Sequence, residues 1–286
     1  MPSPVTLVLL AVLGLGLGCA SAPAARAADP LPLYKAGIAK KKAGDLEGAE
    51  ASFRACLDAD PKYGRCHFSL GVLIKKKGDL AGAEGHFRQA LAAYPTWGQA
   101  HLALGMTLVK KGDPDGGKAE LDAAVADKDL EADDRAEAWN AIGVVHRQAS
   151  RWPDAVAAYD QAIAAKPGAA NFYQNKAIAL EHLDQAAAME AAARKALELG
   201  LDDGTTWLLI GRALMYQKKA DAAVPALQTA TSKAPKDPIP WYALGEAAEA
   251  AGQKAEAKRA FGMYVELAPA EVDRAPVRAR IERLGR

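Results

Sequence analysis

The sequence lacks every short motif that marks a common catalytic centre. It contains no G-x-S-x-G nucleophile turn, no H-E-x-x-H zinc motif, no C-x-x-C pair and no phosphate-binding loop. Its five histidines, His67, His86, His101, His146 and His182, are dispersed, and none has a partner at the spacing of metal ligands. We therefore expect a protein that is not an enzyme and that has no metal site and no cofactor.

Neither sign of charge is in excess, and aromatic residues are few. The chain has 36 lysines and arginines against 35 aspartates and glutamates, which leaves a net charge of +1. This balance gives no electrostatic support for nucleic-acid binding. Aromatic residues make up 6% of the chain, and no alternating apolar pattern is long enough to predict a sheet. The composition therefore predicts an all-α protein that packs many small residues.

Long hydrophobic runs are absent except near the N-terminus. Residues 7–17 form an apolar run that is too short to span a bilayer comfortably, and Ala25-Arg26-Ala27 follows it as an A-x-A cleavage site. We therefore predict a signal peptide over residues 1–27 and a protein exported to the periplasm or the extracellular space. A buried N-terminal helix is the alternative, because no lysine or arginine precedes the run.

Cysteine is scarce, and the three cysteines leave alternatives open. The G-L-G-C sequence that ends at Cys19 is similar to a bacterial lipobox, although that pattern requires Leu, Val or Ile where Gly16 stands. Processing there would put a lipid on Cys19 and anchor the protein to a membrane, which is its only predicted membrane contact. Cys56 and Cys66 flank a predicted turn between helices, where an exported protein permits a disulfide. Two separate buried thiols are the alternative.

Glycine, by contrast, recurs with a fixed period. Gly37, Gly71 and Gly105 lie 34 residues apart. After one step of 38 residues, the spacing continues through Gly143, Ala177, Gly211 and Gly245. A fixed period of this length predicts stacked repeats rather than one closed globule.

Other positions recur with the glycine when it is numbered eight in each repeat. Positions 20 and 27 are mostly small, which lets two helices cross closely, and position 32 is mostly a proline that ends the second helix. Gly-Asp pairs in the first three repeats end one helix and N-cap the next. Position 24 is large and apolar in six repeats: Phe53, Phe87, Leu121, Tyr159, Leu227 and Phe261.

These positions resemble the tetratricopeptide repeat pattern W-x2-L-G-x2-Y…A-x3-F…P, which has the same period. The match is clear in the fourth repeat, at Trp139, Ile142, Gly143, Ala155, Tyr159, Ala162 and Pro167. The resemblance implies a right-handed superhelical α-solenoid of helix-turn-helix units. It covers residues 30–271 as seven repeats, 30–63, 64–97, 98–131, 136–169, 170–203, 204–237 and 238–271. Residues 272–286 are expected to form a C-terminal capping helix.

Two repeats depart from the pattern. The third lacks the terminal proline and is followed by residues 132–135, where we expect a longer loop or an extra helical turn. The fifth has Ala177, Met189 and Leu201 at signature positions, but residues 186–199 are rich in strong helix formers and should still be helical. The cap is expected to be helical over residues 271–284, with Val272 and Val277 among its apolar positions.

The resemblance also implies a binding face, because positions 2, 5, 9, 12 and 13 of each first helix line the concave groove in this family. The groove is predicted to be apolar with a basic edge at its N-terminal end and more polar toward its C-terminal end. Packing within the same repeat is the alternative for each residue. The predicted partner-binding residues are Tyr34, Ile38, Lys41, Phe68, Val72, Lys75, Leu102, Met106, Asn140, Arg147, Gln174, Arg212 and Tyr242.

Lysine runs recur near the ends of the first three of these helices, at residues 40–42, 75–77 and 110–111. They are either solvated cations that complement the helix dipoles or a basic ridge that meets an acidic partner or anionic lipid.

The sequence thus predicts a non-catalytic scaffold of the cell envelope that binds a peptide or a partner subunit in its concave groove. One alternative is an outer-membrane lipoprotein that assists the assembly of a pilus or secretion complex. Another is the recognition subunit of a multi-chain enzyme. The sequence carries no signal for an oligomeric state.

Overall fold

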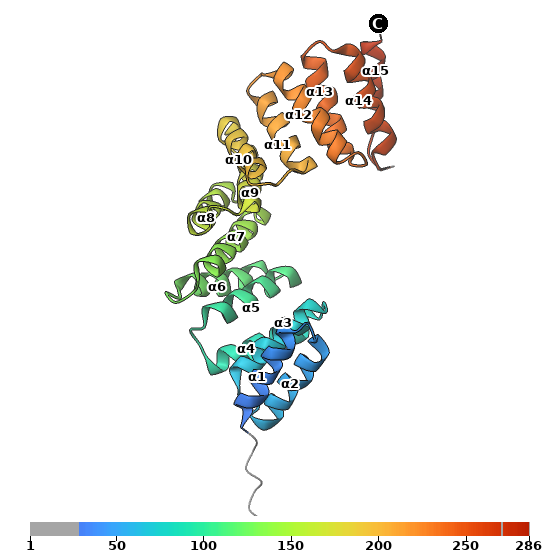
Figure 1. Cartoon of the computed structure of the whole chain (residues 1–286). Helices are drawn as coiled ribbons and strands as arrows, with labels where there is room; N and C mark the ends of the chain where they lie inside the picture. The colour runs from blue at the N-terminus through green and yellow to red at the C-terminus, as the bar shows by residue number, and fades with distance from the viewer. Residues whose placement is uncertain (1–28, 270, 286) are drawn as a thin grey trace, which may run out of the picture.

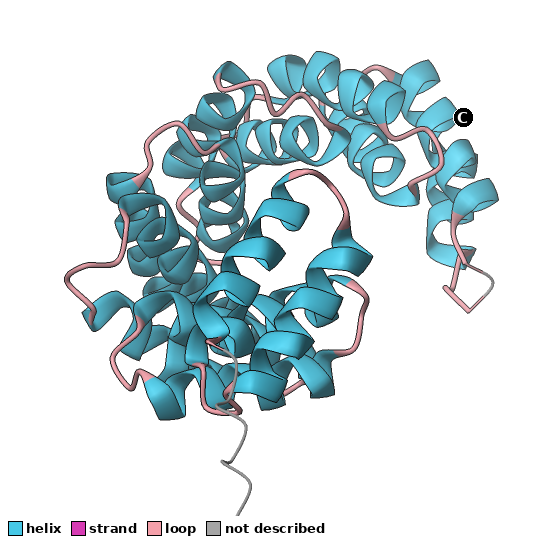
Figure 2. Cartoon of the chain, turned by 60° about the horizontal axis from the view of Figure 1, so that its bottom comes forward, coloured by secondary structure: helices cyan, strands magenta, loops and turns pink. Residues whose placement is uncertain are grey.

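The computed structural model describes residues 29–269 and 271–285, and within these ranges it has fifteen helices and no strand. The predicted signal peptide, residues 1–27 with Cys19, lies outside the described residues. Figure 1 shows the helices following one another along an elongated molecule, and Figure 2 shows that this stack is curved. The helices are α1 (Pro30–Lys42), α2 (Leu46–Ala59), α3 (Gly64–Lys76), α4 (Leu80–Ala93), α5 (Gly98–Lys111), α6 (Pro114–Ala126), α7 (Ala132–Gln148), α8 (Trp152–Ala165), α9 (Ala170–Glu181), α10 (Ala186–Glu198), α11 (Gly204–Tyr216), α12 (Ala220–Lys233), α13 (Pro238–Ala250), α14 (Lys254–Leu267) and α15 (Ala275–Leu284).

The first fourteen helices pair into seven hairpins, from α1 with α2 to α13 with α14. Each hairpin also packs against the next one along the chain, and α15 packs on α14. Helices that are distant in sequence make no comparable contact, because a stacked repeat touches only its neighbours. The all-α solenoid predicted from the sequence is confirmed.

The recurring glycine lies where the two helices of a hairpin meet. A Cβ atom added to Gly143 would lie 2.5 Å from Tyr159 Cε1, and one added to Gly71 would lie 2.8 Å from Phe87 Cε1. The glycine is therefore a steric requirement of the hairpin. The side chains of position 24 that fill the adjoining space are all fully buried: Phe53, Phe87, Leu121, Tyr159, Leu227 and Phe261.

The fifth repeat keeps this contact with a different pair of residues. Ala177 replaces the glycine, and Ala193 replaces the large side chain opposite it. Both are fully buried, and Met189 is buried in the same cluster. Because the larger residue on one helix faces a smaller residue on the other, α9 and α10 still pack as a hairpin.

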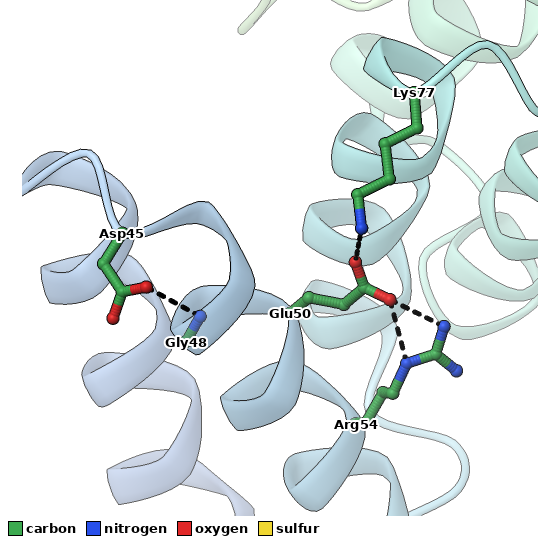
Figure 3. Close-up of polar contacts among 5 residues, drawn as sticks. All are labelled: Asp45, Gly48, Glu50, Arg54 and Lys77. Carbon is green, nitrogen blue, oxygen red and sulfur yellow. Dashed lines mark hydrogen bonds and ion pairs between the residues drawn. The ribbon is translucent and has the colours of Figure 1, made fainter.

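The turns inside the first three hairpins follow the predicted chemistry. Gly44, Gly78 and Gly112 have φ values of 83°, 93° and 91°, a left-handed conformation that favours glycine. The aspartate that follows each glycine caps the next helix. The Asp45 carboxylate accepts a hydrogen bond from the Gly48 N–H at 2.8 Å, as Figure 3 shows.

A glutamate on the second helix of a hairpin connects it to the next repeat. Glu50 on α2 accepts hydrogen bonds from Arg54 on the same helix and from Lys77 at the end of α3, the latter at 2.6 Å (Figure 3). Glu84 pairs with Lys111 across the same interval of 27 residues. These bonds lower the pKa of the Glu50 and Glu84 carboxyls, and the pairs hold Lys77 and Lys111 against the second helices.

In four of the repeats, the residue at position four bonds to the loop that precedes its helix. His67 Nε2 lies 2.9 Å from the carbonyl oxygen of Pro61, and His101 Nε2 lies 2.9 Å from that of Pro95. Tyr173 and Trp241 donate from the same position to the carbonyls of Pro167 and Pro235. All four side chains therefore tether the loop between two repeats, and His67 and His101 have a structural role there.

The additional residues after the third repeat extend the next helix. Residues 132–135 form the first turn of α7, which has 17 residues. The Arg135 guanidinium donates hydrogen bonds to the carbonyls of Val125, Asp127 and Leu130, at 2.8, 2.9 and 3.1 Å. Arg135 thus fixes the connection between α6 and α7 where the proline is missing.

The capping helix begins later than the sequence predicts. It starts at Ala275, whereas residues 271–284 were expected to be helical. Asp273 accepts a hydrogen bond from the Ala275 N–H, and Pro276 lies in the first turn, where its missing N–H is tolerated. Val272 therefore lies outside the helix and is 38% exposed, whereas Val277 is buried against α14 and its neighbours.

A disulfide and a histidine pair fasten the first repeat to the second. Cys56 on α2 and Cys66 on α3 form a disulfide with a Cα–Cα distance of 6.5 Å. Closing a loop of this length stabilises the fold by about 3 kcal/mol in the chain-entropy model. His67 Nδ1 lies 3.0 Å from His86 Nδ1. Because the Pro61 carbonyl can only accept, His67 carries its proton on Nε2, and its Nδ1 accepts from the Nδ1–H of His86.

The steric contact at the glycine predicts opposite effects for two glycine-to-alanine substitutions. Gly143→Ala should lower the free energy of unfolding by about 1–3 kcal/mol, because its Cβ overlaps the Tyr159 ring. Gly85→Ala on α4 is the control, since a Cβ there has no neighbour within 4 Å. It should raise stability by roughly 0.5–1 kcal/mol. Chemical denaturation of both variants tests this, and equal effects would contradict it.

The histidine pair predicts a loss of stability in mild acid. Burial lowers the pKa of His86, the nearby His67 and Arg54 lower it further, and Asp79 opposes them. Below the ordinary histidine pKa of 6.5, the unfolded chain binds more protons than the folded protein. Stability is therefore greatest above this pH and falls as the pH decreases through it.

Thermal melts of the wild type and of His86→Gln between about pH 7.5 and about pH 5.5 check this expectation. The melting temperature of the wild type should fall by more than that of the variant when the pH is lowered. A variant that loses as much as the wild type would show that the pair is not responsible.

Candidate peptide-binding groove

An open cavity of about 460 Å³ lies between α1, α3 and the loop that joins α4 to α5. Four aromatic residues and one isoleucine form half of its lining, and polar or basic residues form the other half. This composition and volume are typical of a site that holds an apolar side chain of a ligand. The lining residues are Tyr34, Ile38, Lys41, Arg65, Phe68, Ser69, Tyr94, Thr96, Trp97 and Gln99.

The aromatic walls are held in place by the hairpin cores beneath them. The Phe68 ring lies 5.9 Å from the buried Phe87 ring and 4.5 Å from the Trp97 ring, measured between centroids. Tyr34 lies 6.1 Å from the buried Phe53 in the same way. In both hairpins, the aromatic side chain at position 5 therefore packs with one side on the buried side chain at position 24. Its other side lines the cavity. A wall fixed in this way loses little conformational entropy when a ligand binds.

The structure brings four of the predicted residues together in this cavity: Tyr34, Ile38, Lys41 and Phe68. Sequence reasoning missed the contribution of the α4–α5 loop. Trp97 is the last residue of the second repeat, and Tyr63 holds the same place in the first. An aromatic residue directly before two successive first helices was the signal available. Arg65 and Gln99 lie at position 2, which also belongs to the stripe of positions that line the groove.

The basic edge of the cavity continues onto α3. Lys75 is half-buried, and its burial lowers the pKa of the ammonium group; the charge of Lys110 lowers it further. Neither lysine has an ion-pair partner among residues 29–269 and 271–285. Val72 packs partly against the N-terminal core, Met106 is 37% exposed, and Leu102 is only 8% exposed. Leu102 therefore belongs to the core rather than to the groove surface.

In the middle of the solenoid, the predicted polar residues Asn140 and Gln174 form hydrogen bonds with residues of the next repeat. Asn175 donates to Asn140 at 2.9 Å. Gln174 donates to Thr206 at 2.8 Å and to the Asp203 carboxylate at 3.1 Å. Both predicted residues thus have partners inside the protein, and they contribute to the stacking of the repeats.

The C-terminal part of the inner face neutralises its own charges. Arg212 forms an ion pair with Glu181 at 2.8 Å and also donates to the Tyr216 hydroxyl. Arg280 on α15 pairs with carboxylates of α13 and lies over the Tyr242 ring, 6.0 Å from its centroid. A smaller cavity of about 180 Å³ lies here, lined by Arg212, Met215, Tyr216, Ile239, Tyr242, Ala243 and Glu246.

Residues 29–269 and 271–285 contain no group of three or more metal-ligating side chains. In the same part of the chain, no helix is both long enough and apolar enough to cross a membrane.

Comparison with known proteins identifies the repeat. The tetratricopeptide repeat profile matches residues 34–96, 102–170 and 208–272. No curated protein matches the chain. Among solved structures, PilF of Pseudomonas aeruginosa is similar with a TM-score of 0.65 and 16% identity, over 74% of this chain and 94% of PilF.

Two further solved structures are similar. PilW, a widely conserved type IV pilus biogenesis factor, has a TM-score of 0.63 and 18% identity, over 75% of this chain and 98% of PilW. YrrB, a repeat protein with an unusual peptide-binding site, has a TM-score of 0.54 and 21% identity, over 62% of this chain and 90% of YrrB. At these identities the similarity shows the fold alone. Because the repeat profile covers most of its length, this chain belongs to the tetratricopeptide repeat family of protein–protein interaction scaffolds.

Proposed function

We propose that this protein is a binding scaffold of the cell envelope that holds a peptide, or a segment of a partner protein, in the N-terminal part of its inner face. The observation that carries this proposal is the aromatic cavity between α1, α3 and the α4–α5 loop. Aromatic side chains on a rigid frame supply much of the binding energy in protein interfaces. The C-terminal inner face is less suited, because its charged groups already pair with each other.

The lining of the cavity supports binding rather than catalysis. Its charged groups are Lys41 and Arg65, and no carboxylate, histidine or cysteine contributes to it. The cavity therefore lacks the side chains that most often act as general acids and bases, namely His, Glu and Asp.

An envelope location is supported by two independent features. Residues 1–27 have the composition of a signal peptide. The Cys56–Cys66 disulfide belongs to an oxidising compartment, since cytosolic thiols are kept reduced.

A lipoprotein that assists the assembly of a pilus or secretion complex is the second candidate. The similarity in fold to PilF and PilW, over about three quarters of this chain, favours it. It would require the lipid on Cys19 that the imperfect lipobox allows.

Groove binding predicts that Phe68→Ala weakens capture of the partner by about tenfold or more, because it removes a wall of the cavity. Immobilised wild-type and variant proteins would be compared for retention of the same envelope protein, identified by mass spectrometry. Tyr216→Ala is the control, because Tyr216 is also aromatic and lines a cavity of the inner face, but this is the smaller C-terminal cavity. Thermal melts confirm that both variants are folded. Loss of capture by Tyr216→Ala alone would move the site to the C-terminal half.

The lipoprotein candidate predicts that Cys19→Ser moves the protein from the membrane fraction to the soluble envelope fraction, because no other anchor is expected. Cell fractionation and immunoblotting measure the distribution, and a Cys56→Ser/Cys66→Ser variant controls for general effects of losing a cysteine. An unchanged distribution in the Cys19 variant excludes lipid anchoring and leaves plain export.

A further inference from the structure

Although the chain has almost no net charge, its charged residues are distributed unevenly between two layers of helices. The inner layer consists of the first helices of the hairpins, and the outer layer consists of the second helices. The first helices of the first three hairpins, α1, α3 and α5, contain lysine or arginine but no aspartate or glutamate. The second helices, α2, α4 and α6, carry carboxylates. The inner layer is therefore cationic at the N-terminal end of the solenoid, although the protein as a whole is nearly neutral.

The lysine runs divide into two sets according to their partners. Lys77 and Lys111 reach outward and pair with Glu50 and Glu84 on the second helices. Six other cations occupy positions 12 or 13 of successive first helices and form no ion pair within residues 29–269 and 271–285: Lys41, Lys42, Lys75, Lys76, Lys110 and Arg147. Lys42 and Lys76 are exposed at position 13, directly after the lysines of position 12. We call one cation from each of the four helices the basic track: Lys41, Lys75, Lys110 and Arg147.

Two members of the basic track act on each other, and neither has an ion-pair partner in the described part of the chain. Burial lowers the pKa of Lys75, and the charge of Lys110 lowers it further, so the two ammonium groups act on each other. A favourable interaction with a helix dipole does not require cations to gather on the inner face. An anionic ligand would relieve the repulsion between the two ammonium groups.

The C-terminal half shows that this arrangement is particular to the N-terminal half. There, position 12 holds Glu181 and Glu249, and each pairs with an arginine of the protein, Arg212 and Arg280 respectively. The charge at position 12 is thus neutralised by another residue of the protein in the C-terminal half, whereas the lysines at position 12 leave the N-terminal half cationic.

We propose, building on the groove function above, that the ligand is an acidic peptide segment that carries an aromatic or large apolar side chain. That side chain enters the cavity between Tyr34, Phe68 and Trp97, and flanking carboxylates pair with the basic track. Positions 5 and 12 of one helix are separated by about 10 Å along its axis. An extended peptide covers that distance in about three residues, so acidic residues close to the anchor are within reach.

The experiment uses short fluorescein-labelled peptides and the purified protein, with binding followed by fluorescence anisotropy. The first peptide has a central phenylalanine flanked by glutamates. The second replaces the glutamates with glutamines, and the third replaces the phenylalanine with alanine. The glutamate–phenylalanine peptide should bind about tenfold more tightly than either of the others at low salt, and its advantage over the glutamine peptide should decrease as salt is added.

Charge reversal at Lys75→Glu and Lys110→Glu together should abolish the preference for glutamate over glutamine. The matched control is Lys236→Glu with Lys254→Glu, which changes the net charge equally at two exposed lysines that also lack ion pairs in the described residues. The control should retain the preference. Thermal melts verify folding, and Lys75→Gln with Lys110→Gln replaces the reversal if that variant does not fold.

The outcomes separate this proposal from the groove function. If the glutamate and glutamine peptides bind equally and Phe68→Ala weakens both, the groove binds peptides but the acidic specificity is wrong. If neither peptide binds more tightly than the alanine peptide, both are overturned. Tighter binding to phosphatidylglycerol vesicles or to a single-stranded oligonucleotide through the same lysines would replace the peptide with another anionic partner.

Discussion

The structure depends on a close approach of two helices at one small residue in every hairpin. At Gly143 a single added carbon would meet the ring of Tyr159, and this constraint recurs down the stack. The fifth repeat shows that the requirement concerns volume rather than glycine itself, since Ala177 is accepted where Ala193 faces it. Protein interiors are close-packed, so a change on one helix has to be matched on the other. Because each hairpin is assembled by this local contact, its outer surfaces are available for stacking and for binding.

Stacking uses polar contacts that repeat with the chain. Glu50 and Glu84 connect successive hairpins through lysines, and His67 and Tyr173 hold the loops between repeats through proline carbonyls. Exposed ion pairs of this kind contribute little free energy individually. Their effect is to fix the orientation of one repeat on the next, in which first helices of successive hairpins, such as α5 and α7 or α11 and α13, contact each other.

This orientation creates the candidate site. Phe68 is anchored on Phe87 beneath it and is contacted by Trp97 from the following loop. The cavity thus combines residues from three successive hairpins, and no single repeat contains it. The lysines at its edge lie on the inner layer, while the carboxylates that could neutralise them lie on the outer layer. The same geometry that builds the solenoid therefore leaves one end of its inner face aromatic and cationic.

The sequence by itself determined the repeat, the helical hairpins, the order of the units and the stripe of residues on each first helix. These properties follow from short-range contacts, which periodicity expresses directly. Only the tertiary structure decided which members of the stripe are exposed. Leu102 and Phe68 share one position, yet Leu102 is buried and Phe68 lines a cavity. Lys75 and Lys77 are nearly adjacent, yet only Lys77 meets a carboxylate. These outcomes depend on how one repeat is turned against the next, and that angle is set by contacts between repeats that no single repeat encodes.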